Sequence, residues 1–455
     1  MATNHDGHAV VLGGSMAGLL ASRVLAERYR TVTVLDRDDL TRPDGGRRGV
    51  PQGAHAHVLL ARGGQVLEEL FPGLTRELVD QDVPYGDPLA QARMHLSGHR
   101  LCRTSTGVAM LSLSRPFLEH HVRERVRALP NVTFAPPCDI VDLSTTPDAG
   151  RVTGVRVVDR GEDARSRTVG ADLVVDATGR GSRTPRWLAG LGYEPPAEEK
   201  AGIAVGYATC YYRLPDDALD GDWGTLHAPT PDLPRGGALN RIERGRWLLT
   251  LLGLGGDHPP TDPGGYVAFA KSLRFPDIHD AICSAEAIEG PLPYRFPANV
   301  RRRYERLARF PDGLLVLGDA VCSFNPIYGQ GMTVAALEAL ALRDHLAAHP
   351  EPRARRFLRD LASLVDDPWQ MAIGGDLMFP GAKGRRTGTI KVAGAYLPRL
   401  HAAATHDAAL AAGFVRVSGM VDPPGTLLRP GVALRVLRHT LAGRRNRRRS
   451  DIPSW

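Results

Sequence analysis

The chain of 455 residues has no apolar run long enough to cross a bilayer, and its first residues, MATNHDGH, form neither a basic nor an apolar segment. The first absence argues against a transmembrane helix, and the second argues against a secretory signal peptide. With 43% apolar residues, the composition is that of a globular protein, which we expect to be cytoplasmic.

Cysteine is scarce and scattered. The five cysteines are odd in number and include no CxxC pair: Cys102, Cys138, Cys210, Cys283 and Cys322. This pattern argues against a disulfide framework and against a cysteine-based zinc site. We therefore expect a reducing compartment and no bound metal.

Aromatic residues make up only 6% of the chain, and its excess of basic residues is concentrated near the end. The formal net charge of +7 equals the charge of the seven arginines between positions 435 and 449, which have no acidic residue among them. A nucleic-acid interface combines a basic face with aromatic side chains, and this run has no aromatic residue. We interpret the run as a solvated tail. In an alternative reading, 427–441 is an amphipathic membrane anchor of a peripheral binding protein.

What the chain does have is the pattern of a βαβ unit at its start. Residues 9–14 predict a buried strand, 16–28 a helix and 31–36 a second strand. A chain of this length has room for two or three domains, so this unit predicts one domain of a larger α/β protein.

The turn of this unit, GGSMAG (13–18), is a dinucleotide fingerprint with Ser15 in place of the middle glycine. Gly13 allows a tight turn, and a small residue at position 15 lets a pyrophosphate approach the backbone. Gly18 lets the helix pack closely on the sheet, and the helix N-terminus attracts the phosphates.

The second strand ends in an acid, Asp36, eighteen residues after Gly18. A carboxylate at this place accepts hydrogen bonds from a ribose diol and repels a 2′-phosphate. The ligand is therefore expected to carry an unphosphorylated adenosine, as FAD and NAD do.

A second site is predicted by residues 314–333, LLVLGDAVCSFNPIYGQGMT. A buried strand ends at Asp319, which is placed to bind a polyol such as the ribityl chain. Gly329 and Gly331 let backbone N–H groups approach a flat ring. A helix starting near Met332 directs its positive end at the N1–C2=O edge of a flavin. An NAD dehydrogenase has no use for this second site, so the pair of sites favours FAD.

The remaining elements are expected as follows: a helix over about 56–70, a helix over 114–129 capped by Ser114, strands over 151–158 and 171–176, a β-rich region over about 200–295, and helices beyond about 366.

Together, these motifs resemble the flavoprotein aromatic-hydroxylase family. The stretches that carry the likeness are GGSMAG, Asp36, DATGRGS (176–182) and GDAVCSFNPIYGQGM (318–332), within residues 9–345. The resemblance implies a p-hydroxybenzoate-hydroxylase-like α/β fold. In that fold a discontinuous Rossmann-type FAD-binding domain holds an inserted β-sheet substrate domain, here followed by a helical C-terminal region.

The implied domains are 1–190 (FAD-binding, first part, with about 85–102 facing the substrate domain), 191–297 (substrate), 298–365 (FAD-binding, second part) and 366–455 (helical, with the basic tail). Two stretches, 47–63 and 366–381, are similar to bacterial flavin epoxidases of polyether biosynthesis, which are relatives of squalene epoxidase.

Each matched position then has an implied role. Gly13, Gly14, Ser15 and Gly18 would bind the pyrophosphate, Asp36 the adenosine ribose, and Ile140 the adenine. The phosphate and ribityl region would be bound by Arg37, Arg48 and Arg115, and the ribityl chain by Asp319. The flavin ring would be bound by Pro326, Gly329, Gly331 and Met332.

The resemblance also implies that reduced FAD reacts with O2 to form a C4a-(hydro)peroxide, which epoxidises an alkene or hydroxylates an aromatic ring. The expected substrate is a hydrophobic, natural-product-like molecule of antibiotic biosynthesis. His57 and Gln52 lie in the loop that the family places near the flavin and are candidates for tuning this chemistry, whereas His55 is expected to brace the loop. NAD(P)H or a separate flavin reductase is expected to supply the electrons.

Two related functions are alternatives. Residues 293–297, PYRFP, faintly resemble an element of FAD-dependent reductases of isoprenoid double bonds, such as geranylgeranyl reductases, but the tryptophan expected there is missing. Flavin-dependent halogenases share the fold, but their WxW element is absent from this chain.

Overall fold

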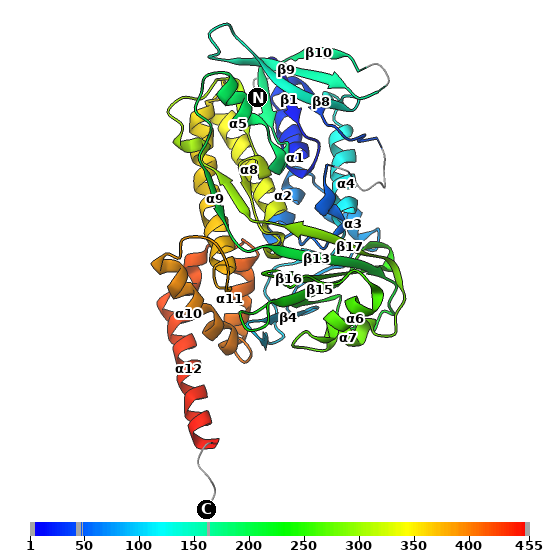
Figure 1. Ribbon diagram of the computed structural model, residues 1–455, viewed down its shortest axis with the longest axis vertical. Helices are drawn as coiled ribbons and strands as arrows, with labels where there is room; N and C mark the ends of the chain where they lie inside the picture. Colours follow the sequence, from blue (N-terminus) through cyan, green and yellow to red (C-terminus); the bar gives the residue numbers. More distant parts are fainter. Residues whose placement is uncertain (1–4, 42–46, 48, 162–163, 451–455) are drawn as a thin grey trace, which may run out of the picture.

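The computed structural model describes residues 5–41, 47, 49–161 and 164–450. One layer is a parallel five-stranded sheet with the strand order β19-β11-β1-β2-β7 (Figure 1). Its strands are β1 (His5–Leu12), β2 (Tyr29–Leu35), β7 (Val132–Phe134), β11 (Leu173–Asp176) and β19 (Leu314–Val316). Because β11 and β19 are neighbours in the sheet but far apart in the chain, the segment between them leaves this sheet and later returns to it.

Both faces of the parallel sheet are covered, which is why its central strands are apolar along their length. Ala9, Val10 and Val11 of β1 have no exposed surface. The helices around this core are α1 (Met16–Leu25), α2 (Ala61–Leu70), α3 (Leu74–Val79), α4 (Arg115–Arg127), α5 (Thr184–Gly190) and α8 (Gln330–Ala348). α1 packs along α8, and a three-stranded antiparallel sheet lies beside β11: β8 (Cys138–Thr145), β9 (Val152–Asp159) and β10 (Ser166–Gly170).

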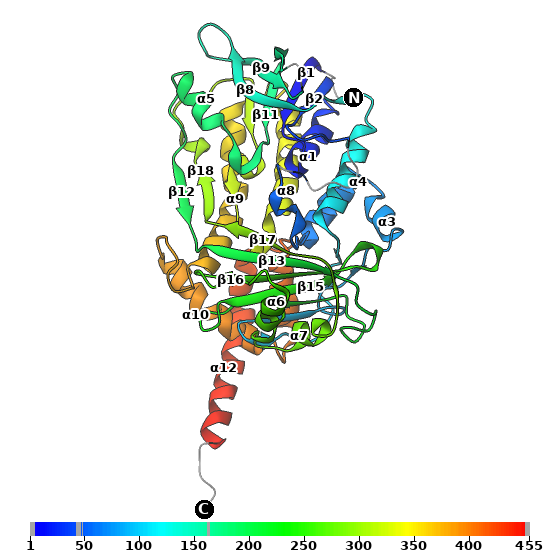
Figure 2. The same cartoon turned by 45° about the vertical axis from the view of Figure 1, so that its right-hand side comes forward.

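The second layer is a seven-stranded sheet with the order β17-β13-β16-β15-β14-β4-β5, which lies across the carboxyl-end side of the first layer (Figure 2). Its strands are β4 (Arg93–Leu96), β5 (His99–Arg100), β13 (Val205–Tyr212), β14 (Gly224–His227), β15 (Arg235–Arg241), β16 (Trp247–Leu254) and β17 (Ala287–Phe296). The segment 85–102 thus contributes two strands to this sheet. Two small sheets complete the strands: β12 (Glu198–Ala201), β18 (Asn299–Arg302) and β20 (Cys322–Ser323), and β3 (Tyr85–Gly86) with β6 (Met110–Leu111).

Two helices in the β-rich region were not predicted: α6 (Pro263–Lys271) and α7 (Asp277–Ile282). They pack on the face of the seven-stranded sheet that points away from the parallel sheet (Figure 2). α6 starts where Asp262 accepts a hydrogen bond from the Gly265 N–H at 2.7 Å. Glycine and proline around these short helices conceal their helical periodicity in the sequence.

The C-terminal region is helical, as predicted, and consists of α9 (Ala354–Asp376), α10 (Gly388–Ala403), α11 (Ala408–Ser418) and α12 (Pro430–Ser450). α9 packs against α8, and α12 projects away from the body of the molecule (Figure 1). Within the part of the chain that the structure describes, no helix combines the length and apolarity needed to span a membrane.

The helix expected from about Ala56 begins five residues later, at Ala61. Residues 56–60 are not helical, and a tertiary contact holds the start of this segment: the N–H of Ala56 donates to the Thr250 hydroxyl of β16 at 2.8 Å. The helix expected from Met332 begins two residues earlier, at Gln330, where Gly329 in the left-handed conformation precedes it.

Candidate cofactor site

The chain turns sharply between β1 and α1, and glycine is needed at two positions of this turn. Gly13 has a φ of +95°, and its N–H donates to the Leu35 carbonyl at 2.7 Å. A Cβ atom on Gly18 would lie 1.8 Å from the carbonyl oxygen of Gly13, so a side chain there would push α1 off the sheet. The N-terminus of α1 therefore lies at the carboxyl edge of β1, where its N–H groups and positive dipole end can attract an anion.

Ser15 precedes α1, but its hydroxyl turns towards α4. It donates to Glu119 at 2.8 Å and accepts a hydrogen bond from Arg115 at 3.0 Å. The Ser15 side chain therefore makes no capping hydrogen bond to the first turn of α1. The N–H groups of that turn remain available to a phosphate oxygen.

Asp36 directly follows β2 and is 7% exposed. One carboxylate oxygen accepts the N–H of Gly14 and the guanidinium of Arg47, both at 2.6 Å, and the other accepts the N–H of Asp38 at 2.8 Å. Burial alone would lower the pKa of Arg47, but Asp36 and Glu119 raise it above its ordinary value. The carboxylate is thereby fixed beside the glycine turn.

Arg115 begins α4 and connects the glycine turn with a second acid, Asp319. Asp319 follows β19, and burial raises the pKa of its carboxyl group while Arg115, Arg180 and Arg302 lower it. Among the described residues, no arginine forms an ion pair with Asp319, because no guanidinium nitrogen lies within 4.0 Å of its carboxylate oxygens. Asp319 thus has acceptor oxygens that are near arginines but form no ion pair with them, which suits the binding of ligand hydroxyl groups.

The loop from Asn325 to α8 is where the flavin ring is predicted to bind. Gly329 has a φ of +65°, and a Cβ atom there would lie 3.2 Å from the Val58 side chain. Gly331, in the first turn of α8, is exposed, and no other atom would lie within 4 Å of a Cβ atom added to it. The nineteen-residue helix α8 therefore directs its positive end at an open surface of small residues.

A buried carboxylate, Asp376 at the end of α9, holds this loop in place. It accepts hydrogen bonds from the Asn299 amide at 2.6 Å, the Asn325 amide at 2.9 Å and the Tyr328 hydroxyl at 2.8 Å. Asn325 in turn accepts from the Tyr207 hydroxyl of β13 at 2.9 Å. Burial raises the pKa of Asp376, and the three donors lower it. The network connects the loop, α9 and the seven-stranded sheet.

Two histidines lie between the glycine turn and the seven-stranded sheet. His55 is buried and bonds to the Thr209 hydroxyl at 2.7 Å through Nδ1. His57 Nδ1 lies 2.9 Å from the His55 carbonyl, so this nitrogen carries the proton and Nε2 faces Arg115 at 3.4 Å as an acceptor. Burial lowers the pKa of His55 to about 4 and, together with Arg115, that of His57 to about 3. Both imidazoles are neutral near pH 7.

The other predicted site residues differ in how deeply they are buried and in what they contact. Gln52 is half-buried, and its carbonyl accepts the N–H of His55 at 3.1 Å. Ile140 is a half-buried residue of β8, and the first N–H of that strand donates to the Asp36 carbonyl at 2.9 Å. The side chain of Arg37 is exposed. Arg48 lies outside the described residues. Pro326 and Met332 flank the glycines of the loop, half-buried and buried respectively.

Five residues around the glycine turn, Asp319 and the loop before α8 were not predicted from the sequence. They are Glu119, Arg180, Arg302, Glu338 and Asp376. Only Arg180 and Asp376 had a signal in the sequence, since each lies in a stretch that resembles the family. Glu338 accepts the N–H of Gly318 at 2.5 Å, and burial raises its pKa to about 8.

Comparison with known proteins gives a consistent picture. No family model matches the sequence. Protein Rv3254 of Mycobacterium tuberculosis is 36% identical over 438 residues, which cover 92% of this chain and 90% of that protein. Kynurenine 3-monooxygenase of Salinispora tropica is 26% identical over 376 residues, covering 75% of this chain and 73% of that enzyme. The solved structure of the flavin-dependent brominase Bmp2 matches with a TM-score of 0.65 and 14% identity over 98% of this chain and 100% of that chain. At this low identity, the similarity to the brominase shows only that the two proteins share a fold.

Proposed function

Because the chain belongs to the same family as protein Rv3254, within the flavoproteins of the aromatic-hydroxylase type, we propose that it is an FAD-dependent monooxygenase of a hydrophobic small molecule. The observation that carries the proposal is the position of Asp319, a half-buried carboxylate directly after β19 whose charge is opposed by nearby arginines. It faces Arg115, and Arg115 also reaches the glycine turn. Arg115 therefore relates the two regions in which the two ends of FAD are predicted to bind.

The residues present fit FAD in both of these regions. The glycine turn of Gly13, Gly14, Ser15 and Gly18 would hold the pyrophosphate at the N-terminus of α1. Asp36 would accept the ribose hydroxyls, and β8, with Ile140, would lie near the adenine. Asp319 would accept the ribityl hydroxyls. Arg115 would neutralise the phosphate charge next to Ser15.

The ring would lie against the loop that leads into α8. Gly329, Gly331 and Met332 would place backbone N–H groups at its edge, and the positive end of α8 would favour the negative charge that the ring gains on reduction. Asp376 would keep the loop rigid through Asn325 and Tyr328. When bound and reduced, FAD would supply the activation of O2 for transfer of one oxygen atom.

The substrate would lie between the loop and the seven-stranded sheet. An apolar cluster of β13, β16 and β17 residues joins the loop there, and its partly buried members include Tyr294, Ile327 and Met378. Such a wall excludes water and favours a hydrophobic molecule, either an alkene to be epoxidised or an aromatic ring to be hydroxylated. Natural-product (antibiotic) biosynthesis would supply substrates of this kind.

His57 would act as a neutral hydrogen-bonding residue beside the cofactor rather than as an acid. Its unprotonated Nε2 accepts from Arg115, so it would orient this arginine towards the phosphates. Gln52, in the same loop, would contact the substrate or the ring. NAD(P)H or a separate flavin reductase would deliver the electrons.

Oxygen labelling of the FAD-loaded protein tests the proposal. The purified protein is first titrated with FAD, and the bound flavin is then reduced anaerobically and exposed to oxygen-18 gas with a panel of alkenes and phenols. A product that carries one label supports the monooxygenase. An unlabelled hydrogenated product would indicate a double-bond reductase, and a brominated product in the presence of bromide would indicate a halogenase. A protein that binds no FAD would overturn the whole assignment.

A further inference from the structure

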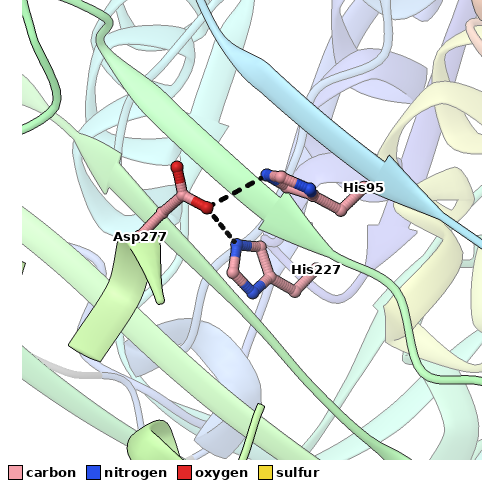
Figure 3. Close-up of side chains that lie close together, drawn as sticks. All are labelled: His95, His227 and Asp277. Carbon is pink, nitrogen blue, oxygen red and sulfur yellow. Dashed lines mark ion pairs between the residues drawn. The ribbon is translucent and has the colours of Figure 1, made fainter. Parts of the chain in front are cut away.

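A second group of chemically active side chains lies in the seven-stranded sheet. His95 of β4, His227 of β14 and Asp277 at the start of α7 converge on one point (Figure 3). The Asp277 carboxylate oxygen lies 3.3 Å from His95 Nε2 and 3.6 Å from His227 Nε2. The three residues come from three separate segments of the chain, so the sequence did not indicate this cluster.

The fold holds the three side chains together. β4 and β14 pair in parallel with His95 directly opposite His227, so the two imidazoles lie on the same face of the sheet. Their rings are 4.5 Å apart, and Phe275 packs against His95 at 4.1 Å. His95 and His227 are 2% and 4% exposed. The cluster is therefore part of the interior between the sheet and α7.

Both histidines lack hydrogen bonds although they are buried. Within the described residues, none of their four ring nitrogens has a hydrogen-bond partner. The 3.6 Å contact is too long for a hydrogen bond, and the 3.3 Å contact is poorly directed. Buried polar groups are normally satisfied, because leaving one unpaired costs about 1–3 kcal/mol. The cluster thus has unused ligand atoms aimed at a common point.

The distances fit a metal ion. In a tetrahedral Zn²⁺ site with bonds of about 2.0–2.1 Å, neighbouring ligand atoms are about 3.3–3.4 Å apart. The two carboxylate-to-imidazole distances, 3.3 Å and 3.6 Å, are close to this edge length, and all three ligand atoms lie within 4.8 Å of one another.

The surrounding charges also suit a cation. The second oxygen of Asp277 accepts from Arg93 at 2.6 Å, which fixes the orientation of the carboxylate. Arg93 also pairs with Asp220 and Asp222, and Arg103 pairs with Asp222. Two guanidinium groups thus face three carboxylates, so this network carries a net negative charge before any metal binds. Beside it lies a cavity of about 10 Å³ with room for one water molecule. Its lining includes His95, His227 and Thr230, and also Arg235 and Arg274, whose charges are each balanced by an ion pair with Asp257 or Asp232.

We propose that His95, His227 and Asp277 bind one divalent transition-metal ion, with Zn²⁺ favoured by the two nitrogen ligands and one oxygen ligand, and that water from the cavity completes the tetrahedron. The ion joins β4, which precedes the inserted region in the chain, to β14 and α7 within it. The site lies on the β14–β4 side of the sheet, separated from β13 by β16 and β15. Its role is therefore to clamp the sheet, not to take part in the flavin chemistry.

Cobalt binding tests the proposal. The full-length protein, with any affinity tag removed, is stripped with EDTA and titrated with CoCl2. The expected result is one Co²⁺ per chain, with the visible absorption of a tetrahedral site, displaced by ZnCl2. Zn²⁺ is also expected to raise the Tm of the stripped protein. A wild-type protein that binds neither ion, or that shows only octahedral Co²⁺, would overturn the proposal.

Variants show whether these residues are the ligands. His227→Gln and Asp277→Asn are expected to weaken Co²⁺ binding about 100-fold and to remove the Zn²⁺-dependent rise in Tm. His279→Gln and Asp280→Asn, on the same short helix but outside the cluster, serve as matched controls and should bind like the wild type. FAD titration and circular dichroism check that each variant is folded. Should His227→Gln fold and bind Co²⁺ as tightly as the wild type, the ion lies elsewhere and the cluster is only a structural contact.

Discussion

The side-chain amide of Asn325 donates to the Asp376 carboxylate at 2.9 Å and so joins the loop before α8 to the end of α9. The same buried carboxylate accepts from Asn299 and Tyr328. Three donors from two elements, β18 and the loop itself, thus depend on one acid, and they position the loop on which the flavin ring is proposed to lie.

Removing this acid is expected to disorder the loop. Asp376→Ala leaves three buried donors unpaired and should lower the free energy of unfolding by about 3 kcal/mol and weaken FAD binding about tenfold. Urea unfolding and fluorescence titration with FAD measure the two effects. Asp367→Asn, an exposed acid on the same helix, is the control. If Asp376→Ala binds FAD as the wild type does, Asp376 does not position the flavin loop.

The buried ion pair of Asp36 and Arg47, 2.6 Å long, gives a second prediction. Asp36→Ala removes the acceptor of Gly14 and of the ribose hydroxyls and leaves Arg47 without one of its partners. The expected result is a Kd for FAD at least about tenfold higher and a loss of about 3 kcal/mol of stability. Isothermal titration calorimetry compares it with Asp39→Asn, an exposed acid on the same turn. Equal affinity of both variants would exclude Asp36 from cofactor binding.

The steric role of Gly18 is tested by adding a single methyl group. Gly18→Ala places a Cβ atom 1.8 Å from the Gly13 carbonyl oxygen, so α1 must move, and we expect FAD binding to be lost together with more than about 3 kcal/mol of stability. Gly64→Ala, within α2, meets no atom within 4 Å and should stabilise the protein by about 0.5–1 kcal/mol. Thermal unfolding of both variants, with and without FAD, distinguishes these outcomes.

Glu338 predicts a dependence of stability on pH. Its carboxyl group is buried, and its pKa rises from 4.5 to about 8. The contribution of Glu338 to the free energy of unfolding is thus fully present below pH 4.5. This contribution is lost as pH rises towards 8, because in that range the Glu338 carboxyl group ionises only in the unfolded chain. Glu338→Gln removes this loss and should be more stable than the wild type by about 3 kcal/mol at pH 7, but not at pH 4.

Unfolding of the wild type and of Glu338→Gln at several pH values between 4 and 8 measures the effect, and the exposed Glu194→Gln serves as a control. A difference between the first two proteins that stays constant over this range would show that Glu338 does not titrate as proposed.

His57, unlike Glu338, is expected to cause no pH dependence near neutrality, because burial and Arg115 lower its pKa to about 3. It is neutral throughout the range from pH 5 to pH 9, so replacing it should not change the shape of the pH–rate profile. His57→Gln keeps an acceptor for Arg115 and should bind FAD more tightly than His57→Ala. An ionisation near pH 6–7 that is present in the wild type and missing in His57→Gln would contradict this role.

Sequence reasoning was most successful where the requirement is local. The glycine turn, the strand that ends at Asp36 and the strand–loop–helix around Asp319 all follow from short-range sterics and from the helix dipole. The sequence did not show α6 and α7, because both helices are short and have glycine or proline within or next to them. It also misplaced the start of α2, where a hydrogen bond from the Ala56 N–H to Thr250 of β16 holds the preceding non-helical residues.

By itself, the sequence determined the parallel core, the inserted sheet and the helical end, and it predicted two places for a dinucleotide cofactor, because each depends on contiguous residues and their periodicity. The tertiary structure alone decided which distant residues meet. It placed Glu119 beside Ser15, Asp376 beside Asn325, and His95 opposite His227 with Asp277 next to both. Such pairings depend on strand register and helix packing between segments far apart in the chain, and residue order does not encode them locally.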